Sequence, residues 1–197
     1  MSAKSTKNMI YETIVRLAEE RTLEKVTVVD IIEEMGIARQ TFYYYYHSIP
    51  EVYFNRMLVT VPTDEPVGRD ILFALRKINA FCAAVEKEKD VSVQFFRVYA
   101  DELCDMMHDL FLGFITRAIQ STYGRDIPQR SLATISEFHA DGYIGVIRKW
   151  VIEGMDGGQP IISVIKDAWA SMIMSDAVES IRNTFVNERT LRSAEPP

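Results

Sequence analysis

The sequence predicts an all-α protein of about nine helices, in which a small N-terminal helical domain precedes a larger C-terminal helical bundle. Apolar residues recur at spacings of three and four through most of the chain, and no stretch shows the alternation of a strand. The clearest breaks fall at clusters of Gly and Pro. A chain of 197 residues with 48% hydrophobic and 25% charged residues has the composition of a folded globular protein.

The first two helices are expected at about 5–21 and 28–35. The first carries one apolar stripe, formed by Ile10, Ile14, Leu17 and Ala18. Thr27 can cap the second helix with its side-chain oxygen, and Asp30 stands three positions later, where a capping box has its acidic member. Gly36 follows the last apolar residue and can adopt the left-handed conformation that ends a helix.

A third helix is expected over 38–47, and its two sides separate at 100° per residue. The side with access to a core holds Ala38, Thr41, Phe42, Tyr45 and Tyr46. The other side holds Arg39, Gln40, Tyr43, Tyr44 and His47. Ser48 and Glu51 then form an S-x-x-E capping box with Pro50 in the first turn, so a fourth helix is expected at about 49–60.

The segment "TVPTDEPVGRD" contains several helix breakers and indicates a junction in the chain. We therefore expect a first domain over 1–48 and a second over 49–197, with the fourth helix as their connection. The later helices are expected at about 68–88, 91–98, 100–123, 128–154 and 160–187.

Two short helices joined by a tight Gly-containing turn, with an upstream helix over their apolar faces, are typical of a helix-turn-helix. The second helix of that motif enters the major groove of DNA with its N-terminal residues first. Arg39 and Gln40 are then candidates for reading bases, because Arg pairs with guanine and Gln with adenine through two hydrogen bonds each. The candidates for contacts with the DNA backbone are Thr27, Thr41, Tyr43, Tyr44 and His47.

Charge alone does not favour DNA binding by this chain. The net charge is −6, and the first 60 residues hold seven Lys or Arg against eight Asp or Glu. A short helix with aromatic residues on both sides could also be buried between two domains, as in a helical bundle. The DNA-binding interpretation therefore depends on the geometry of individual residues rather than on a basic patch.

The run "KVTVVDIIEEMGIARQTFYYYYHSIPEV" resembles the DNA-binding signature of TetR-type transcriptional regulators over roughly residues 8–58. The similarity implies an all-α homodimer that binds a palindromic operator through its N-terminal domains and a small effector through its C-terminal domains. It also implies that the base-reading and backbone-contacting positions are those named above. Two positions depart from the family pattern: Ile49 replaces a Lys that contacts a phosphate, and Ile32 replaces a small Ala.

The C-terminal two-thirds of the chain has a stripe of aromatic and Met residues, most of which must be ordinary core. Bundles of this size often enclose an apolar cavity, so we expect an effector pocket here. Its candidate residues are Phe81, Phe96, Tyr99, Leu103, Met107, Phe111, His139 and Tyr143. Cys104 and His108 share a helix face beside carboxylates, but lack further ligands at metal spacing, so no metal site is expected.

The last two long helices are expected to pair with a second copy of the chain, because their apolar stripes are wider than one neighbour can cover. The candidate interface residues are Ile147, Trp150, Val151, Ile165, Trp169, Met172 and Ile173. Gly142 and Gly145 would allow close approach of another helix. The alternative is a monomer that buries both stripes internally.

The sequence as a whole predicts a homodimeric, sequence-specific DNA-binding regulator, a repressor that a small effector releases from a palindromic operator. An adaptor of the same fold that binds a protein partner is the alternative, and an activator is a third interpretation. The enzyme motifs G-x-S-x-G, Walker A and H-E-x-x-H are absent, and we expect no catalysis and no cofactor. The N-terminus lacks the apolar core of a signal peptide and no apolar run is long enough for a membrane span, so a cytoplasmic location is expected.

Overall fold

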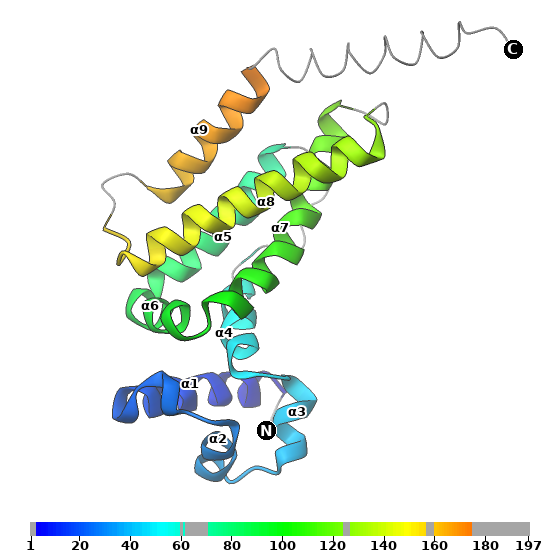
Figure 1. Cartoon of the computed structure of the whole chain (residues 1–197). Coiled ribbons are helices and arrows are strands. Elements are labelled where there is room, and N and C mark those ends of the chain that lie inside the picture. Colours follow the sequence, from blue (N-terminus) through cyan, green and yellow to red (C-terminus); the bar gives the residue numbers. More distant parts are fainter. Residues whose placement is uncertain (1–2, 60, 62–70, 124–126, 157–159, 175–197) are drawn as a thin grey trace, which may run out of the picture.

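The computed structural model describes residues 3–59, 61, 71–123, 127–156 and 160–174, and most of these residues lie in helices (Figure 1). The elements are α1 (Ala3–Arg21), the 3-10 helix η1 (Leu23–Lys25), α2 (Val28–Met35), α3 (Arg39–Tyr45), α4 (Ile49–Leu58), α5 (Ile71–Lys87), α6 (Lys89–Val98), α7 (Ala100–Tyr123), α8 (Gln129–Ile152) and α9 (Ile161–Met174). The predicted all-α class is confirmed. The expected continuation of the last helix to 187 lies outside the described residues.

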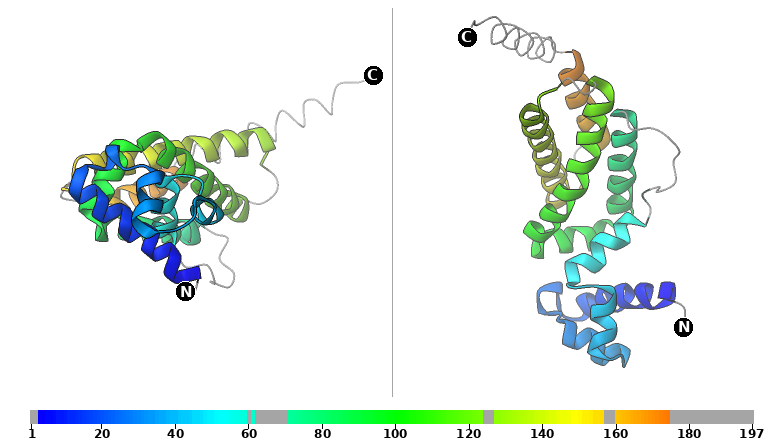
Figure 2. Two further views of the ribbon diagram at one scale, coloured as in Figure 1. Left: turned by 90° about the horizontal axis from the view of Figure 1, so that it is seen from below. Right: turned by 90° about the vertical axis from the view of Figure 1, so that its right-hand side faces the viewer.

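Helices α1, α2 and α3 lie together at one end of the molecule, which we call the head (Figures 1 and 2). The longer helices α5, α7, α8 and α9 form a bundle at the other end, and α7 and α8 run side by side. Helix α4 leads from the head into the bundle, and it contacts α1 on one side and both α5 and α7 on the other. The head therefore reaches the bundle through α4 and the ends of the helices around it.

The predicted boundaries of α2 are confirmed, because the signals that set them are local. The backbone N–H of Asp30 donates to Thr27 Oγ1 at 3.2 Å, and the Asp30 carboxylate accepts from the Thr27 N–H at 2.8 Å. Both halves of the capping box are thus formed. Gly36 ends the helix with a φ of 63°, a left-handed conformation that other residues adopt at a steric cost.

Helix α3 is shorter than the range 38–47 expected for it. Ala38 is its N-cap, and the helix ends because Tyr46 has extended backbone angles. Ser48 is also extended, as the N-cap of α4 has to be, and it accepts a hydrogen bond from the Glu51 N–H. Because Ser48 has to be extended to cap α4, the backbone leaves the helical conformation at Tyr46, and α3 ends at Tyr45.

The described helices are all too short or too polar to cross a lipid bilayer.

Candidate nucleic-acid interface

Helix α3 has one buried side and one exposed side. Phe42 and Tyr46 are 0% and 5% exposed, so they anchor the helix in the core of the head. The exposed residues are Arg39, Gln40, Tyr43, Tyr44 and His47. This division agrees with the sequence-based expectation except at Ala38, which is exposed. Tyr44 is 80% exposed, which is unusual for a large ring, so the outer side of α3 presents an aromatic surface to solvent.

Aromatic contacts hold the exposed side chains of α3 in defined orientations. The Arg39 guanidinium lies 5.4 Å from the centroid of the Tyr43 ring, within the range of a cation–π contact. The Tyr43 ring in turn meets the buried Phe42 ring edge to face at 5.4 Å. Because Phe42 is fixed in the core, this stack limits the positions open to Arg39 and leaves its N–H groups free to donate.

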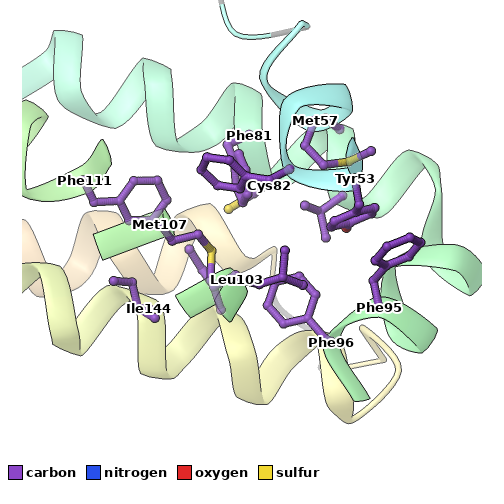
Figure 3. Packing of buried hydrophobic residues seen from close by; sticks show 14 of the residues in the cluster. Tyr53, Met57, Phe81, Cys82, Phe95, Phe96, Leu103, Met107, Phe111 and Ile144 are labelled. Atoms are coloured by element: carbon purple, nitrogen blue, oxygen red, sulfur yellow. The ribbon is translucent and has the colours of Figure 1, made fainter. Parts of the chain in front are cut away.

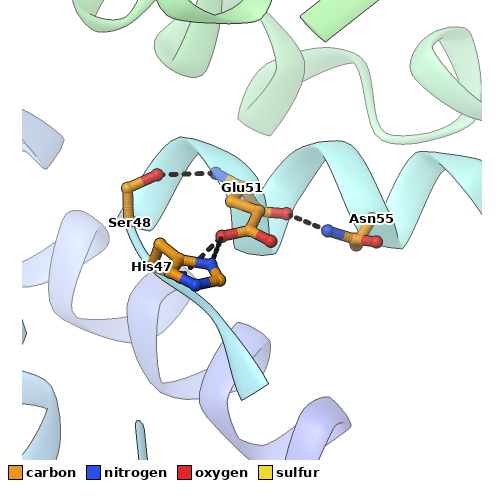
Figure 4. Close-up of polar contacts among 4 residues, drawn as sticks. All are labelled: His47, Ser48, Glu51 and Asn55. Atoms are coloured by element: carbon orange, nitrogen blue, oxygen red, sulfur yellow. Dashed lines mark hydrogen bonds and ion pairs between the residues drawn. The ribbon is translucent and has the colours of Figure 1, made fainter. Parts of the chain in front are cut away.

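The turn between α3 and α4 is held by the carboxylate of Glu51 (Figure 4). It accepts a hydrogen bond from the His47 backbone N–H, and His47 Nδ1 lies 3.1 Å from the same carboxylate oxygen. The Asn55 side-chain amide donates to the Glu51 carbonyl oxygen at 3.0 Å. His47 remains exposed, but a negative charge already stands at the start of α4.

Two of the expected backbone-contacting residues are less free than α3 itself. The Thr27 hydroxyl donates to the Asp30 carboxylate at 2.6 Å, so its proton is engaged inside the protein. Thr41 is half-buried between the two sides of α3. Sequence reasoning missed the engagement of Thr27 because a capping residue and a phosphate-binding residue are drawn from the same amino acids.

Most of the residues expected to line an effector pocket lie in the buried core of the bundle, and Figure 3 shows five of them there. Six of the eight are buried: Phe81, Phe96, Leu103, Met107, Phe111 and Tyr143. The rings of Phe81 and Phe111 meet edge to face at 5.8 Å. His139 and Tyr99 are half-buried, and the Tyr143 hydroxyl lies 3.3 Å from His139 Nδ1.

A cavity of about 790 Å³ lies between α7 and α8, and none of those eight residues is among its lining residues. Its wall consists of Leu112, Thr116, Arg117, Gln120, Ser121, Ile127, Gln129, Leu132, Ala133 and Glu137. The aromatic and Met stripes of the sequence did not indicate this cavity, because such side chains pack on one another and fill the space between them. Polar residues on the facing sides of two helices would have been the better signal.

The apolar stripe that suggested a pairing surface is the core face of α8. Ile147, Trp150 and Val151, and Ile165 on α9, are buried within the single chain. Trp169, Met172 and Ile173 belong to α9, but their side chains lie outside the described residues. The opposite side of α8 exposes Phe138 over 74% of its surface, together with Gly142 and Gly145, whose backbone has open space around it. A second helix would have to approach on that side.

In the Cys104 and His108 region, the His108 ring lies close to two carboxylates. His108 Nε2 lies 3.6 Å from an Asp141 oxygen, and its Nδ1 lies 3.9 Å from Asp109. Within the described part of the chain, no three His, Cys, Asp or Glu side chains converge as metal ligands do. Burial raises the pKa of the Cys104 thiol, which keeps the thiol protonated and a poor ligand.

The comparisons with known proteins bear on the head alone. Residues 10–53 match the family model of bacterial regulatory proteins of the tetR family, a range that starts in α1 and ends in α4. A comparison with curated proteins gave no match. The matched range contains the capped α2, the Gly36 turn and the exposed side of α3, so this part of the chain is similar to the DNA-binding domain of tetR-family regulatory proteins.

Proposed function

We propose that the protein is a repressor that binds a near-palindromic operator as a homodimer and leaves it when a small effector binds the bundle. The proposal rests on the exposed side of α3. This side presents Arg39 and Gln40 at the N-terminal end of the helix, which is the end that enters the major groove in a helix-turn-helix. Each bidentate contact with a base would contribute about 1–3 kcal/mol of discrimination. Tyr43 and Tyr44 would donate to phosphates and fix the register without adding charge.

Homodimerisation is proposed through the exposed side of α8. Phe138 is an exposed apolar ring, and the two glycines after it let another backbone come close. In an antiparallel pair, the acidic Glu137 and Asp141 of one copy would approach the basic Arg148 and Lys149 of the other. Phe138→Glu should therefore shift the protein to monomers in light scattering, and should weaken operator binding without changing the fold seen by circular dichroism.

We propose that residues 1–48 bind DNA and that residues 49–197 form the effector and dimer contacts. Helix α4 would transmit the effector signal, since it contacts α1 of the head as well as α5 and α7 of the bundle. An effector acts only through its different affinity for the two positions of the heads. A ligand that raises DNA affinity would make the protein an activator.

Selection from a random duplex pool tests the DNA-binding role. The wild-type protein should enrich a palindrome whose half-sites are about 34 Å apart along the DNA. Arg39→Ala should relax the preference at one base position in each half-site, while Tyr43→Phe should weaken binding and keep the preference. Equal loss on every sequence from Arg39→Ala would contradict its base-reading role. A wild-type protein that enriches no sequence would favour the adaptor, with the tyrosine side of α3 as a surface for a protein partner.

A further inference from the structure

We infer that Lys7 on α1 binds a DNA phosphate beside the C-terminal end of α3, an assignment that rests on the proposed DNA-binding function. It assigns a charge contact to a residue outside the helix-turn-helix, and it explains how an acidic protein holds a polyanion. The inference follows from the positions of the cations in the head.

Most arginines of the head and of α4 are already paired with carboxylates. Arg16 contacts Glu20 at 2.8 Å and also contacts Glu34. Arg21 Nη1 lies 3.0 Å from Asp30, and Arg56 Nε lies 3.3 Å from Glu88. Among the described side chains of residues 6–59, three cations lack a carboxylate partner, and these are Lys7, Lys25 and Arg39.

Lys7 lies at the end of the recognition helix. Its Nζ is 5.6 Å from the centroid of the Tyr46 ring, and Tyr46 is the C-cap of α3. Tyr46 itself is buried, so the exposed Lys7 covers its ring and carries the charge at the surface there. Lys25 lies beyond the C-terminal end of α1. At a rise of 1.5 Å per residue, that end is about 20 Å from Lys7, so Lys25 cannot contact the same phosphate.

This end of α3 otherwise lacks a free cation among the described residues. Ile49 is buried in the core of the head, so the position offers no charge to solvent. His47 is held against Glu51, whose carboxylate occupies the start of α4. A phosphate beside the C-terminal end of α3 would therefore meet the Lys7 ammonium, which lies over the Tyr46 ring.

A phosphate contact has a characteristic salt dependence. Each neutralised phosphate contributes about 0.9 to the slope of log K against log salt concentration. Loss of Lys7 should lower the slope by about 0.9 for each head on the DNA, or about 1.8 for a dimer on a palindrome. Sequence preference should not change, because phosphates are alike at every base pair.

The test measures binding of the full chain to a fixed random-sequence duplex of about 30 base pairs by fluorescence anisotropy, over a series of KCl concentrations. Lys7→Gln should show the lower slope, Lys7→Arg should restore it, and Lys87→Gln, an equal charge change on the exposed end of α5, should keep the wild-type slope. A wild-type slope for Lys7→Gln, or the same decrease for Lys87→Gln, would overturn the assignment.

The experiment separates failure of this assignment from failure of the proposed function. If the wild-type protein binds the duplex but enriches no palindrome, sequence-specific regulation fails while the effect of Lys7 on the slope is still measured. A wild-type protein that binds no duplex at all would overturn both. Thermal melting of Lys7→Gln controls for folding, and a wild-type melting temperature is expected because the side chain is exposed.

Discussion

A buried hydrogen-bond chain joins α4 to α6 and α5, and the effect of removing it on stability can be worked out. The Tyr53 hydroxyl donates to Ser92 Oγ at 2.8 Å, and the Ser92 hydroxyl donates to the Val85 carbonyl oxygen at 2.8 Å. Tyr53 and Ser92 are both 0% exposed, and the Tyr53 ring stacks on Phe95 at 4.4 Å. Water cannot replace a lost partner at this place without a rearrangement of the core.

Ser92→Ala should destabilise the protein more than Tyr53→Phe. Tyr53→Phe removes one hydrogen bond and leaves Ser92 paired with Val85, so we expect a loss of about 1 kcal/mol. Ser92→Ala removes both bonds and leaves a phenol hydroxyl buried without an acceptor, which adds about 1–3 kcal/mol of desolvation. The double variant has no unpaired phenol hydroxyl. Its loss of stability should therefore be smaller than the sum of the losses of the two single variants, by about 1 kcal/mol or more.

Guanidinium unfolding of the four proteins measures this cycle. The midpoints should shift while the slope m stays constant, because the surface exposed on unfolding hardly changes. Additivity within about 0.3–0.5 kcal/mol would refute the reasoning, since it would mean that Tyr53 and Ser92 do not depend on one another.

Three further predictions concern the head and α8. Thr27→Ala should cost about 1 kcal/mol of stability in denaturant unfolding through loss of the α2 cap. Tyr44→Ala should change stability by less than about 0.5 kcal/mol yet weaken DNA binding in anisotropy, whereas the buried Tyr46→Ala should cost about 3–5 kcal/mol. Burial lowers the pKa of His139, so the stability present above its ordinary pKa should fall as pH drops through the lower folded value. His139→Gln should flatten that decline in melts between about pH 7 and pH 5.

Local signals in the sequence were enough to predict the architecture of the head. Thr27, Asp30 and Gly36 set the ends of α2 through bonds to their own neighbours, so the expected and observed boundaries agree. Helical periodicity predicted the two sides of α3, because it places Phe42 and Tyr46 on the same side, which faces the core of the head. The length of α3 did not follow, since its end depends on the cap of the next helix.

The features of the bundle could not be predicted in the same way, because they depend on which side of each helix meets another. Val151 is apolar and regularly spaced whether it faces its own core or a second copy, and the sequence does not distinguish the two. A stripe that includes Phe81 and Phe111 likewise indicates a buried face but not whether that face encloses a space. The position of the cavity at Arg117 depends on how α7 and α8 pack together, which the sequence of each helix alone does not determine.

One polar contact between head and bundle has a strength comparable with typical allosteric coupling free energies. The Tyr11 hydroxyl donates to the Glu88 carboxylate, and Arg56 from α4 contacts the same carboxylate while it lies 5.2 Å from the Tyr11 ring centroid. Burial and then the Glu88 acceptor raise the pKa of Tyr11, so the phenol keeps its proton as a donor. A hydrogen bond to a charged group contributes about 1.5–3 kcal/mol, less where the pair is partly exposed as at Arg56. Allosteric coupling free energies are typically about 1–3 kcal/mol. Under the proposed function, a ligand with a differential affinity of about 1–3 kcal/mol against this arrangement of α1, α4 and Glu88 would redirect the head without disrupting the apolar contacts of Tyr53.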